Sequence, residues 1–407
     1  MRHWSAHLFR TEARKNGLPP EQVARAWAFT ESLQHSGLAP VLTLRQLAAV
    51  SGTRFGTLKD VVSRRKIRQH YRSFRISKRS GGTRRIVVAS NEVASCHRWI
   101  HENILSPAPV HRVAFGFRRG SDVPGGNPIR ACAAQHCGSR WLIKFDVAGF
   151  FESLDERRVF GALSALGYPR LVSFELARIC TVPLQSIERR SSGEKQSVPT
   201  EPDPFLGLPH PPEPPELPEP PELPYPPELP YPPCSQGVLG QGLATSPVLS
   251  NLICLQLDAE LERIASKRSL QVTRYADDIT FSSAEKTLSK RQIRRIRNSV
   301  ITALGKNQLK ENRSKFSVCG PGARKVVLGL LVDGDEPRLT KATRARIEGH
   351  LHFMAKGVAS HATARNFRSL HGLREHVQGL IAYARQVDPS RATQYQQAFD
   401  RIPWPPT

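Results

Sequence analysis

Long apolar runs are absent from this sequence of 407 residues. No stretch approaches the roughly 18 consecutive apolar residues that a membrane-spanning helix requires. Residues 1–16 mix charged residues and histidine without an apolar core, so we expect no secretory leader there. These absences disfavour a membrane protein and a membrane partner.

Cysteine is also scarce, with 7 residues and no pair at the CxxC spacing. Because no second pair of Cys or His stands at zinc-ligand spacing, a structural zinc site is disfavoured. An odd number of cysteines without a disulfide pattern is typical of reduced thiols. We therefore expect a protein of the reducing cytoplasm.

Acidic residues are outnumbered, since 35 Asp and Glu stand against 59 Lys and Arg and the formal net charge is +24. An excess of this size favours a polyanionic partner, either nucleic acid or an anionic membrane surface. Because apolar membrane segments are absent, nucleic acid is the favoured partner. The length leaves room for two or three domains of roughly 150 residues each.

One segment differs from the rest in composition. Residues 199–233 contain 17 of the chain's 33 prolines and seven acids, but no Lys or Arg. A six-residue unit recurs there, once as PPELPE and twice as PPELPY. Because proline fixes φ and lacks an N–H, we expect an extended polyproline II insertion. It is either a surface insertion without a role, or an arm that docks a partner or covers a basic groove.

The remaining sequence predicts a mixture of helices and strands. Apolar residues at helical spacing predict helices at 20–35, 43–50, 246–264, 293–304 and after Thr340. Alternating or continuous apolar residues predict hairpins at 71–88 and 272–282 and strands at 141–147 and 326–332. Thr43 is expected as the N-cap of the second helix.

Carboxylates occur in two apolar strand contexts. Asp146 lies in KFDVAGFF, and Asp277 and Asp278 lie in YADDI. Adjacent carboxylates repel each other unless a cation neutralises them. Two Mg²⁺ ions about 3.5–4 Å apart, held by such a trio, are typical of phosphoryl transfer. An Asp-Asp pair alone is more often an ordinary turn.

A basic hairpin and a glycine-containing loop accompany these carboxylates. The hairpin expected at 71–88 carries Lys78 and Arg84 on opposed strands, which offers two cations to a triphosphate. The alternative is a hairpin that binds RNA. The loop QGLATSP begins at Gln241 and lies between the two acidic motifs in the sequence.

The order of these motifs, over roughly residues 40–400, resembles that of reverse transcriptases. The basic hairpin resembles the fingers, FDVAGFF motif A, QGLATSP with LSNL motif B, and YADD motif C. Within that superfamily the chain is most similar to bacterial retron enzymes. Cys132 replaces the Asn of their Asn-Ala-x-x-His element, whose histidine is His136 here, and Leu328 replaces the Thr of their Val-Thr-Gly.

This resemblance implies an α+β right-hand polymerase fold. The palm would combine an antiparallel sheet with helices, and the thumb would be helical. The implied boundaries are 1–65 for an N-terminal helical region, 66–140 for the fingers, 141–335 for the palm and 336–407 for the thumb. The proline-rich polyproline II insertion, at about 190–236, would interrupt the palm.

The resemblance also assigns catalytic roles. Asp146, Asp277 and Asp278, with the carbonyl of Val147, would hold two Mg²⁺ ions, with Mn²⁺ as the alternative metal. Lys315, in NRSKF, matches the lysine that protonates the leaving pyrophosphate, although a solvated surface lysine is the alternative.

Further residues would contact the nucleotide and the RNA. Lys78 and Arg84 would hold the β and γ phosphates of a dNTP, and Gln241 and Gly242 would approach the incoming nucleotide. Phe151 would crowd a ribose 2′-hydroxyl and so select deoxynucleotides. A basic thumb would bind the phosphates and 2′-hydroxyls of an RNA duplex. Its expected RNA-binding residues are Arg344, Arg346, Lys356, Arg365, Arg368 and Arg374.

The implied function is an RNA-directed DNA polymerase of the bacterial cytoplasm. It would copy a structured noncoding RNA from a guanosine 2′-hydroxyl and retain an RNA–DNA hybrid. The product would be a branched RNA–DNA molecule (msDNA) that serves antiphage defence with an effector protein. Two alternatives stay open: a non-retron defence-associated or group II intron-like reverse transcriptase, and a catalytically inert RNA-binding scaffold.

Overall fold

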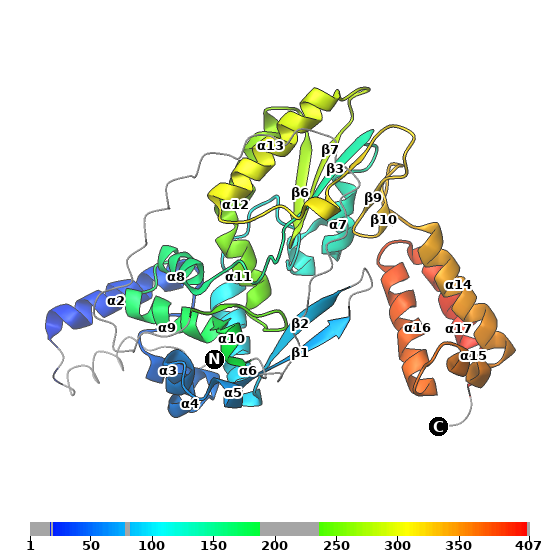
Figure 1. Cartoon of the computed structure of the whole chain (residues 1–407). Helices are drawn as coiled ribbons and strands as arrows, with labels where there is room; N and C mark the ends of the chain where they lie inside the picture. Colours follow the sequence, from blue (N-terminus) through cyan, green and yellow to red (C-terminus); the bar gives the residue numbers. More distant parts are fainter. Residues whose placement is uncertain (1–16, 18, 78–81, 188–235, 405–407) are drawn as a thin grey trace, which may run out of the picture. The chain divides into compact units, whose positions relative to one another are not determined.

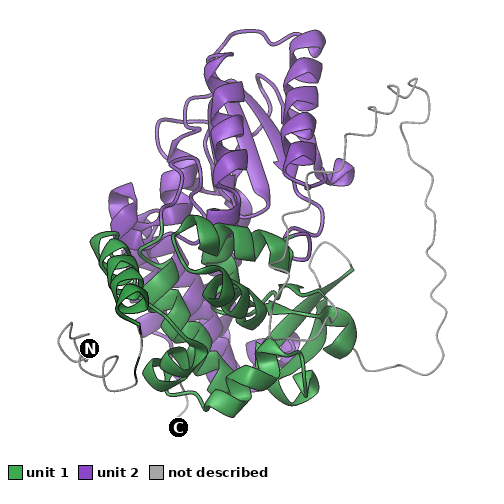
Figure 2. Ribbon diagram, turned by 90° about the vertical axis from the view of Figure 1, so that its left-hand side faces the viewer, with its two compact units in different colours: residues 1–108, 154–249 green, residues 109–153, 250–407 purple. Residues whose placement is uncertain are grey.

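The computed structural model describes residues 17, 19–77, 82–187 and 236–404. The chain divides into two compact units, one of residues 1–108 and 154–249 and the other of residues 109–153 and 250–407 (Figure 2). The subdomain boundaries expected at 65, 140 and 335 are not tested by this division and stay predictions. The proline-rich segment 199–233 lies outside the described residues.

The first unit is mainly helical, and local sequence signals set its helix ends. At the start of α3 (Leu44–Ser51), the Thr43 hydroxyl accepts a hydrogen bond from the Gln46 N–H at 3.1 Å, which confirms the predicted cap. Gly52, at φ +67°, ends this helix. The unit also contains α2 (Pro20–His35), α4 (Phe55–Val62), α5 (Ile67–His70), α6 (Asn91–Ile100), the π-helix η1 (His101–Leu105), α8 (Glu156–Ala165), α9 (Arg170–Cys180), β4 (Thr181–Val182), α10 (Leu184–Ile187), β5 (Val238–Leu239) and the start of α11 (Ser246–Ile253).

Strands β1 (Tyr71–Ser77) and β2 (Thr83–Ala89) form the antiparallel hairpin that the sequence predicts (Figure 1). Tyr71 and Val87 lie on its buried face. Ile76 pairs with Arg84 on the opposite face, where Phe74 is also exposed. One face of the hairpin therefore presents apolar and basic side chains together.

The second unit is built on a four-stranded antiparallel sheet in the order β6-β7-β3-β8. Leu142, Phe145 and Phe281 are buried in this sheet, while α12 packs against both β6 and α13. Its elements are η2 (Gly120–Asp122), η3 (Pro124–Gly126), α7 (Pro128–Ala134), β3 (Trp141–Asp146), α12 (Leu255–Ser266), β6 (Gln271–Tyr275), β7 (Asp278–Ser283), α13 (Lys290–Lys306), η4 (Arg313–Lys315), β8 (Ser317–Cys319), β9 (Val326–Val327), β10 (Leu330–Leu331), β11 (Arg338–Leu339), α14 (Lys341–Lys356), α15 (Val358–Ala364), α16 (Leu370–Arg385) and α17 (Pro389–Asp400).

Two predicted elements are wrong in detail. The apolar stripe at 246–264 predicts one helix, but Cys254 separates α11 from α12 and is the N-cap residue of α12. Residues 326–332 form a hairpin of β9 and β10 rather than one strand. Leu328 (φ +48°) and Gly329 (φ +82°) reverse the chain there. In both places the apolar periodicity continued across a backbone break.

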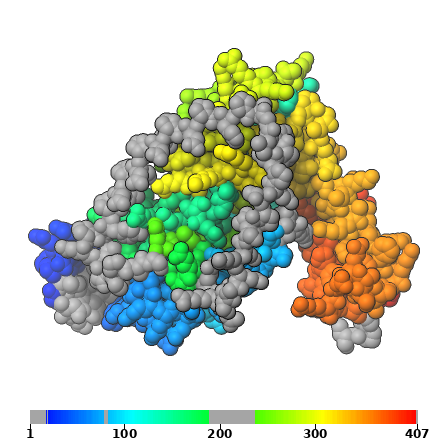
Figure 3. Space-filling model, in the orientation of Figure 1, coloured from blue at the N-terminus to red at the C-terminus, as the bar shows by residue number. Residues whose placement is uncertain are grey.

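Four helices, α14 to α17, follow Thr340 and confirm the predicted helical tail (orange to red in Figures 1 and 3). Ile347, Leu351 and Met354 of α14 are buried as predicted, in a cluster that also contains side chains of α15, α16 and α17. No described helix is both long and apolar enough to cross a membrane.

Candidate active site

The two acidic motifs meet at one end of the central sheet. Strand β3 ends at Asp146, strand β7 begins at Asp278, and these two residues are direct partners in the antiparallel register. Direct partners point to the same face of a sheet, with their Cα atoms about 4.5–5.5 Å apart. The fold therefore brings two of the three predicted carboxylates side by side.

Asp277 belongs to the tight turn between β6 and β7. Its carbonyl oxygen accepts a hydrogen bond from the Val147 N–H at 3.1 Å, so the turn is tied to the residue after Asp146. Ala276 precedes it with φ +55°, a left-handed conformation that costs an L-residue free energy. All three acidic residues and Val147 are thus gathered at one end of the sheet.

The Asp146 carboxylate is bonded at both oxygens. Asn312 Nδ2 donates to Oδ1 at 2.8 Å, and Lys315 Nζ lies 2.7 Å from Oδ2. The Asn312 N–H also donates to the Asp146 carbonyl at 2.8 Å. The hydrogen bond to Asp146 raises the pKa of Lys315, whose side chain is 54% exposed. Lys315 is therefore a partly exposed cation that is bonded directly to a predicted metal ligand.

The charges at this end of the sheet suit a divalent cation. Burial, followed by the charges of Asp277 and Asp146, raises the pKa of the Asp278 carboxyl, and Lys144 and Lys315 only partly oppose this. Carboxylate oxygens are the hard ligands that Mg²⁺ prefers. Among the described residues, no three His, Cys, Asp or Glu side chains are arranged so that they could hold a metal ion. The residues fit a magnesium site by donor type and charge, and the site stays a prediction.

Two adjacent phenylalanines follow motif A and differ in exposure. Phe150 is only 4% exposed and belongs to the core. Phe151 is half-buried, with its ring centroid 5.4 Å from that of Phe150 and 6.1 Å from that of Phe117. Phe151 is therefore the more accessible of the two rings, and its contact with a sugar stays a prediction.

The predicted nucleotide residues of motif B lie in the first unit and are fixed to the hairpin. The Gln241 carbonyl accepts a hydrogen bond from the Val87 N–H of β2 at 2.7 Å. Gly242 has φ +108°, and a Cβ there would lie 2.6 Å from the Val87 oxygen, so only glycine fits. Arg84 is exposed on the same strand, whereas Lys78 lies outside the described residues.

The predicted RNA-binding cations all lie on helices of the tail or the turns that join them. Arg344 is half-buried, and the other five are exposed. The Arg374 guanidinium lies 5.5 Å from the ring centroid of Trp404. Their contacts with RNA stay predictions. The five exposed residues are Arg346, Lys356, Arg365, Arg368 and Arg374.

The histidine of the retron-like element braces the hairpin that carries motif C. His136 is buried, with Nδ1 2.8 Å from the Ser282 hydroxyl of β7 and Nε2 2.7 Å from the Thr273 hydroxyl of β6. Burial, reinforced by the charge of Lys144, lowers the pKa of His136 to about 3, so the ring is neutral. Cys132 donates to the same Thr273 hydroxyl at 3.3 Å. Sequence spacing identified this histidine but not its partners.

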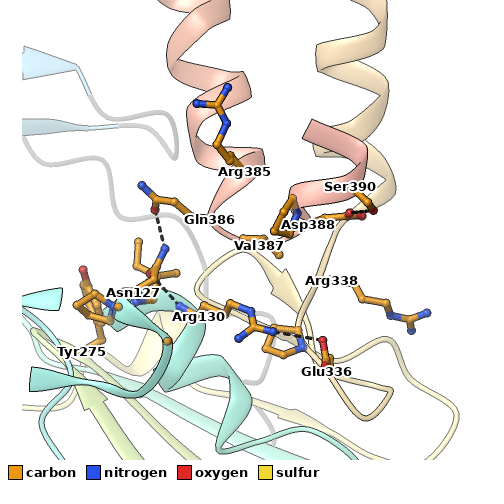
Figure 4. A pocket seen from close by; sticks show the side chains of 16 residues that line it. Asn127, Arg130, Tyr275, Glu336, Arg338, Arg385, Gln386, Val387, Asp388 and Ser390 are labelled. Carbon is orange, nitrogen blue, oxygen red and sulfur yellow. Dashed lines mark hydrogen bonds and ion pairs between the residues drawn. The ribbon is translucent and has the colours of Figure 1, made fainter. Parts of the chain in front are cut away.

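Sequence reasoning missed two further features of the second unit. One is a buried ion pair between Arg274 and Asp258, for which an arginine in an apolar strand was the only signal. The other is an open pocket of about 1050 Å³ beside Tyr275 (Figure 4). Asn127 and Gln386 meet in its wall, where Asn127 Nδ2 donates a hydrogen bond to the side-chain oxygen Oε1 of Gln386 at 2.6 Å.

Known proteins resemble this chain in sequence. Residues 234–350 match the family model described as reverse transcriptase (RNA-dependent DNA polymerase). The retron Mx65 reverse transcriptase of Myxococcus xanthus is 30% identical over 362 residues, covering 88% of this chain and 72% of that protein. The retron Ec86 reverse transcriptase of Escherichia coli is 24% identical over 361 residues, covering 88% and 89%.

Among solved structures, telomerase from Candida albicans, in complex with a fragment of telomeric RNA, has a TM-score of 0.38 and 11% identity. The match covers 82% of this chain and 56% of that one. Telomerase from Candida tropicalis has a TM-score of 0.39 and 10% identity, covering 81% and 60%.

The sequence matches define the class of protein. The chain is a reverse transcriptase, an RNA-directed DNA polymerase with the right-hand α+β fold. Within that class it belongs to the retron reverse transcriptases. This resolves the alternatives left open by the sequence in favour of an enzyme of the retron type.

Proposed function

We propose that this reverse transcriptase copies a structured noncoding RNA into DNA and leaves a branched RNA–DNA molecule (msDNA) for antiphage defence with an effector protein. The observation that carries the catalytic part is the direct pairing of Asp146 with Asp278 beside Asp277. The retron relatives support the choice of template and product. Bacterial relatives and six free cysteines among the described residues support a cytoplasmic location.

Asp146, Asp277 and Asp278, with the Val147 carbonyl, are proposed to hold two Mg²⁺ ions, or Mn²⁺. When bound, such a pair of ions activates the attacking hydroxyl and stabilises the leaving pyrophosphate. Lys315 can move from the Asp146 carboxylate to the pyrophosphate and donate a proton there, because its side chain is largely exposed. Asn312 keeps the carboxylate of Asp146 oriented throughout.

The remaining predicted residues select and hold the substrates. Arg84 and Lys78 bind the triphosphate of a dNTP. Gln241 and Gly242 lie close to the incoming nucleotide. Phe151 excludes a ribose 2′-hydroxyl by its bulk. The exposed cations of α14 and α16 and of the segment around α15 hold the RNA template and the RNA–DNA hybrid through phosphates and 2′-hydroxyls.

This proposal is tested by expressing the gene together with the DNA that flanks it and sequencing the nucleic acid that co-purifies with the protein. We expect one structured RNA joined at an internal guanosine to a short DNA. The Asp277→Asn/Asp278→Asn variant should co-purify with the same RNA without DNA. Random RNA, or DNA that is not joined to RNA, would contradict the proposal.

A further inference from the structure

Arg274 is the largest fully buried side chain of the described residues, and it lies three positions before Asp277. Its guanidinium forms a bidentate pair with Asp258 of α12, with Nε 2.5 Å from Oδ1 and Nη2 2.7 Å from Oδ2. Both side chains are 0% exposed. A buried ion pair stabilises a fold little in comparison with apolar residues of similar volume. We therefore expect this ion pair to position neighbouring groups rather than to stabilise the fold.

The other hydrogen bonds of Arg274 supply that role. Nη1 donates to the Ala276 carbonyl at 3.2 Å, inside the turn that carries Asp277. Nη2 also donates to Asn251 Oδ1 at 3.1 Å, in the LSNL segment of motif B. Asn251 Nδ2 in turn donates to the Gly116 carbonyl at 2.7 Å. One arginine thus joins helices α11 and α12, the Gly116 segment and the catalytic turn.

The turn needs this support because its backbone is strained. Ala276 has φ +55°, a region that an alanine rarely adopts without external contacts. The backbone of Gly116 packs against it so closely that a Cβ there would lie 2.7 Å from the Ala276 nitrogen. The Phe115 N–H also donates to the Arg274 carbonyl at 2.8 Å. The surroundings therefore fix the turn from two sides.

We propose that Arg274 is a positioning residue for catalysis, held by Asp258 and Asn251 so that its bond to the Ala276 carbonyl sets the spacing of Asp277 and Asp278 from Asp146. The proposal rests on the proposed metal site at these three carboxylates. Arg274 itself contacts no substrate and no metal. It acts through the turn, and a small displacement of this turn changes how well paired divalent ions are held.

Two variants separate positioning from simple stability. Arg274→Lys keeps a cation for Asp258, but the three N–H donors of lysine leave a single nitrogen. They cannot span the separate acceptors on Asp258, Ala276 and Asn251 that the guanidinium reaches through three nitrogens. Asn251→Ser leaves the ion pair between Arg274 and Asp258 intact but removes one of the hydrogen bonds that orient the guanidinium. This variant tests the proposal even if Arg274→Lys does not fold. Arg178→Lys is the matched control, because Arg178 of the first unit pairs with Glu156 at 2.6 Å and is also buried.

The measurements are Mn²⁺ binding by electron paramagnetic resonance, primer extension on an RNA template against Mg²⁺ concentration, and the melting temperature. We expect Arg274→Lys to weaken Mn²⁺ binding about tenfold and to lower kcat about a hundredfold, the cost of roughly 1 Å of misplacement. The KM for dNTP and the affinity for template–primer should change less than threefold. Asn251→Ser should follow in the same direction with a smaller effect.

Arg178→Lys should lower the melting temperature without changing metal binding. If Arg274→Lys and Asn251→Ser bind Mn²⁺ as the wild type does and lose activity only in proportion to their melting temperature, Arg274 is merely structural and the proposal is overturned. Failure of the proposed function would give a different result. If the three carboxylates do not form the metal site, the Asp277→Asn/Asp278→Asn variant, with Arg274 unchanged, would retain Mn²⁺ binding and DNA synthesis.

Discussion

Asp146 and Asp278 are direct cross-strand partners at the end of the central sheet, although they come from motifs far apart in the sequence. Their pairing follows from the antiparallel register of β3 and β7, in which Phe145 opposes Ile279 and Lys144 opposes Thr280. A shift of one residue would send one carboxylate to the opposite face. The buried apolar residues of the two strands therefore fix the geometry of the acidic site.

The two phenylalanines after motif A offer a matched pair of substitutions. Phe151→Ala should admit ribonucleotides, because it removes the bulk that would meet a 2′-hydroxyl. Phe150→Ala should leave the preference unchanged and lower the free energy of unfolding by about 3–5 kcal/mol, as for other buried rings. Competition between dNTP and rNTP in primer extension measures the first effect, and denaturant unfolding measures the second. If Phe151→Ala keeps the wild-type preference for dNTP over rNTP, Phe151 does not exclude ribonucleotides.

Lys315→Met should slow the chemical step about a hundredfold, because it removes the proposed proton donor to pyrophosphate. Single-turnover nucleotide incorporation measures this rate directly. Lys310→Met is the control, since Lys310 is an exposed lysine of the same segment whose side chain has no proposed role. Equal rates for the two variants would show that Lys315 is an ordinary surface lysine.

Removing residues 199–233 should leave DNA synthesis in vitro intact. The described chain on either side supports this, because β4 and β5 pair with Thr181 opposite Leu239, so the fold joins these strands through its own backbone hydrogen bonds. Primer extension and the melting temperature of the shortened protein are the measurements. Lost synthesis at an unchanged melting temperature would assign this segment a part in catalysis.

His136 should make stability depend on pH. Its pKa is about 3 in the folded protein and about 6.5 when unfolded, so the unfolded state binds more protons between these values. Stability from this group is complete above pH 6.5 or so and falls as the pH decreases, by at most about 1.4 kcal/mol per pH unit. His136→Gln should flatten the pH dependence of the free energy of unfolding between pH 5 and pH 7. Parallel curves for the two proteins would contradict a buried neutral imidazole.

Elements with strong local signals were predictable from the sequence. The Thr43 cap, the β1–β2 hairpin and the buried face of α14 follow from capping chemistry and apolar periodicity, which act within a few residues. The break at Cys254 was missed because apolar spacing continues across it. The hairpin at Leu328 was missed although Gly329 was a turn signal.

The candidate site was likewise only partly predictable from the sequence. Motif order predicts the three acidic residues, and the register of the sheet brings Asp146 and Asp278 together. Lys315 on Asp146 and Arg274 under the turn could not be predicted, because both contacts depend on tertiary packing between distant elements. Sequence patterns thus predict which residues form the site, while long-range packing determines how these residues are positioned.

The central claim is that Asp146, Asp277 and Asp278 form one site for divalent ions that supports DNA synthesis. Mn²⁺ titration followed by electron paramagnetic resonance, on wild type and on Asp277→Asn/Asp278→Asn with a bound RNA–DNA duplex, tests it most directly. We predict that the variant keeps its melting temperature and duplex affinity but loses the tightly bound Mn²⁺ and all nucleotide incorporation. Wild-type Mn²⁺ binding or incorporation by the folded variant would contradict the account.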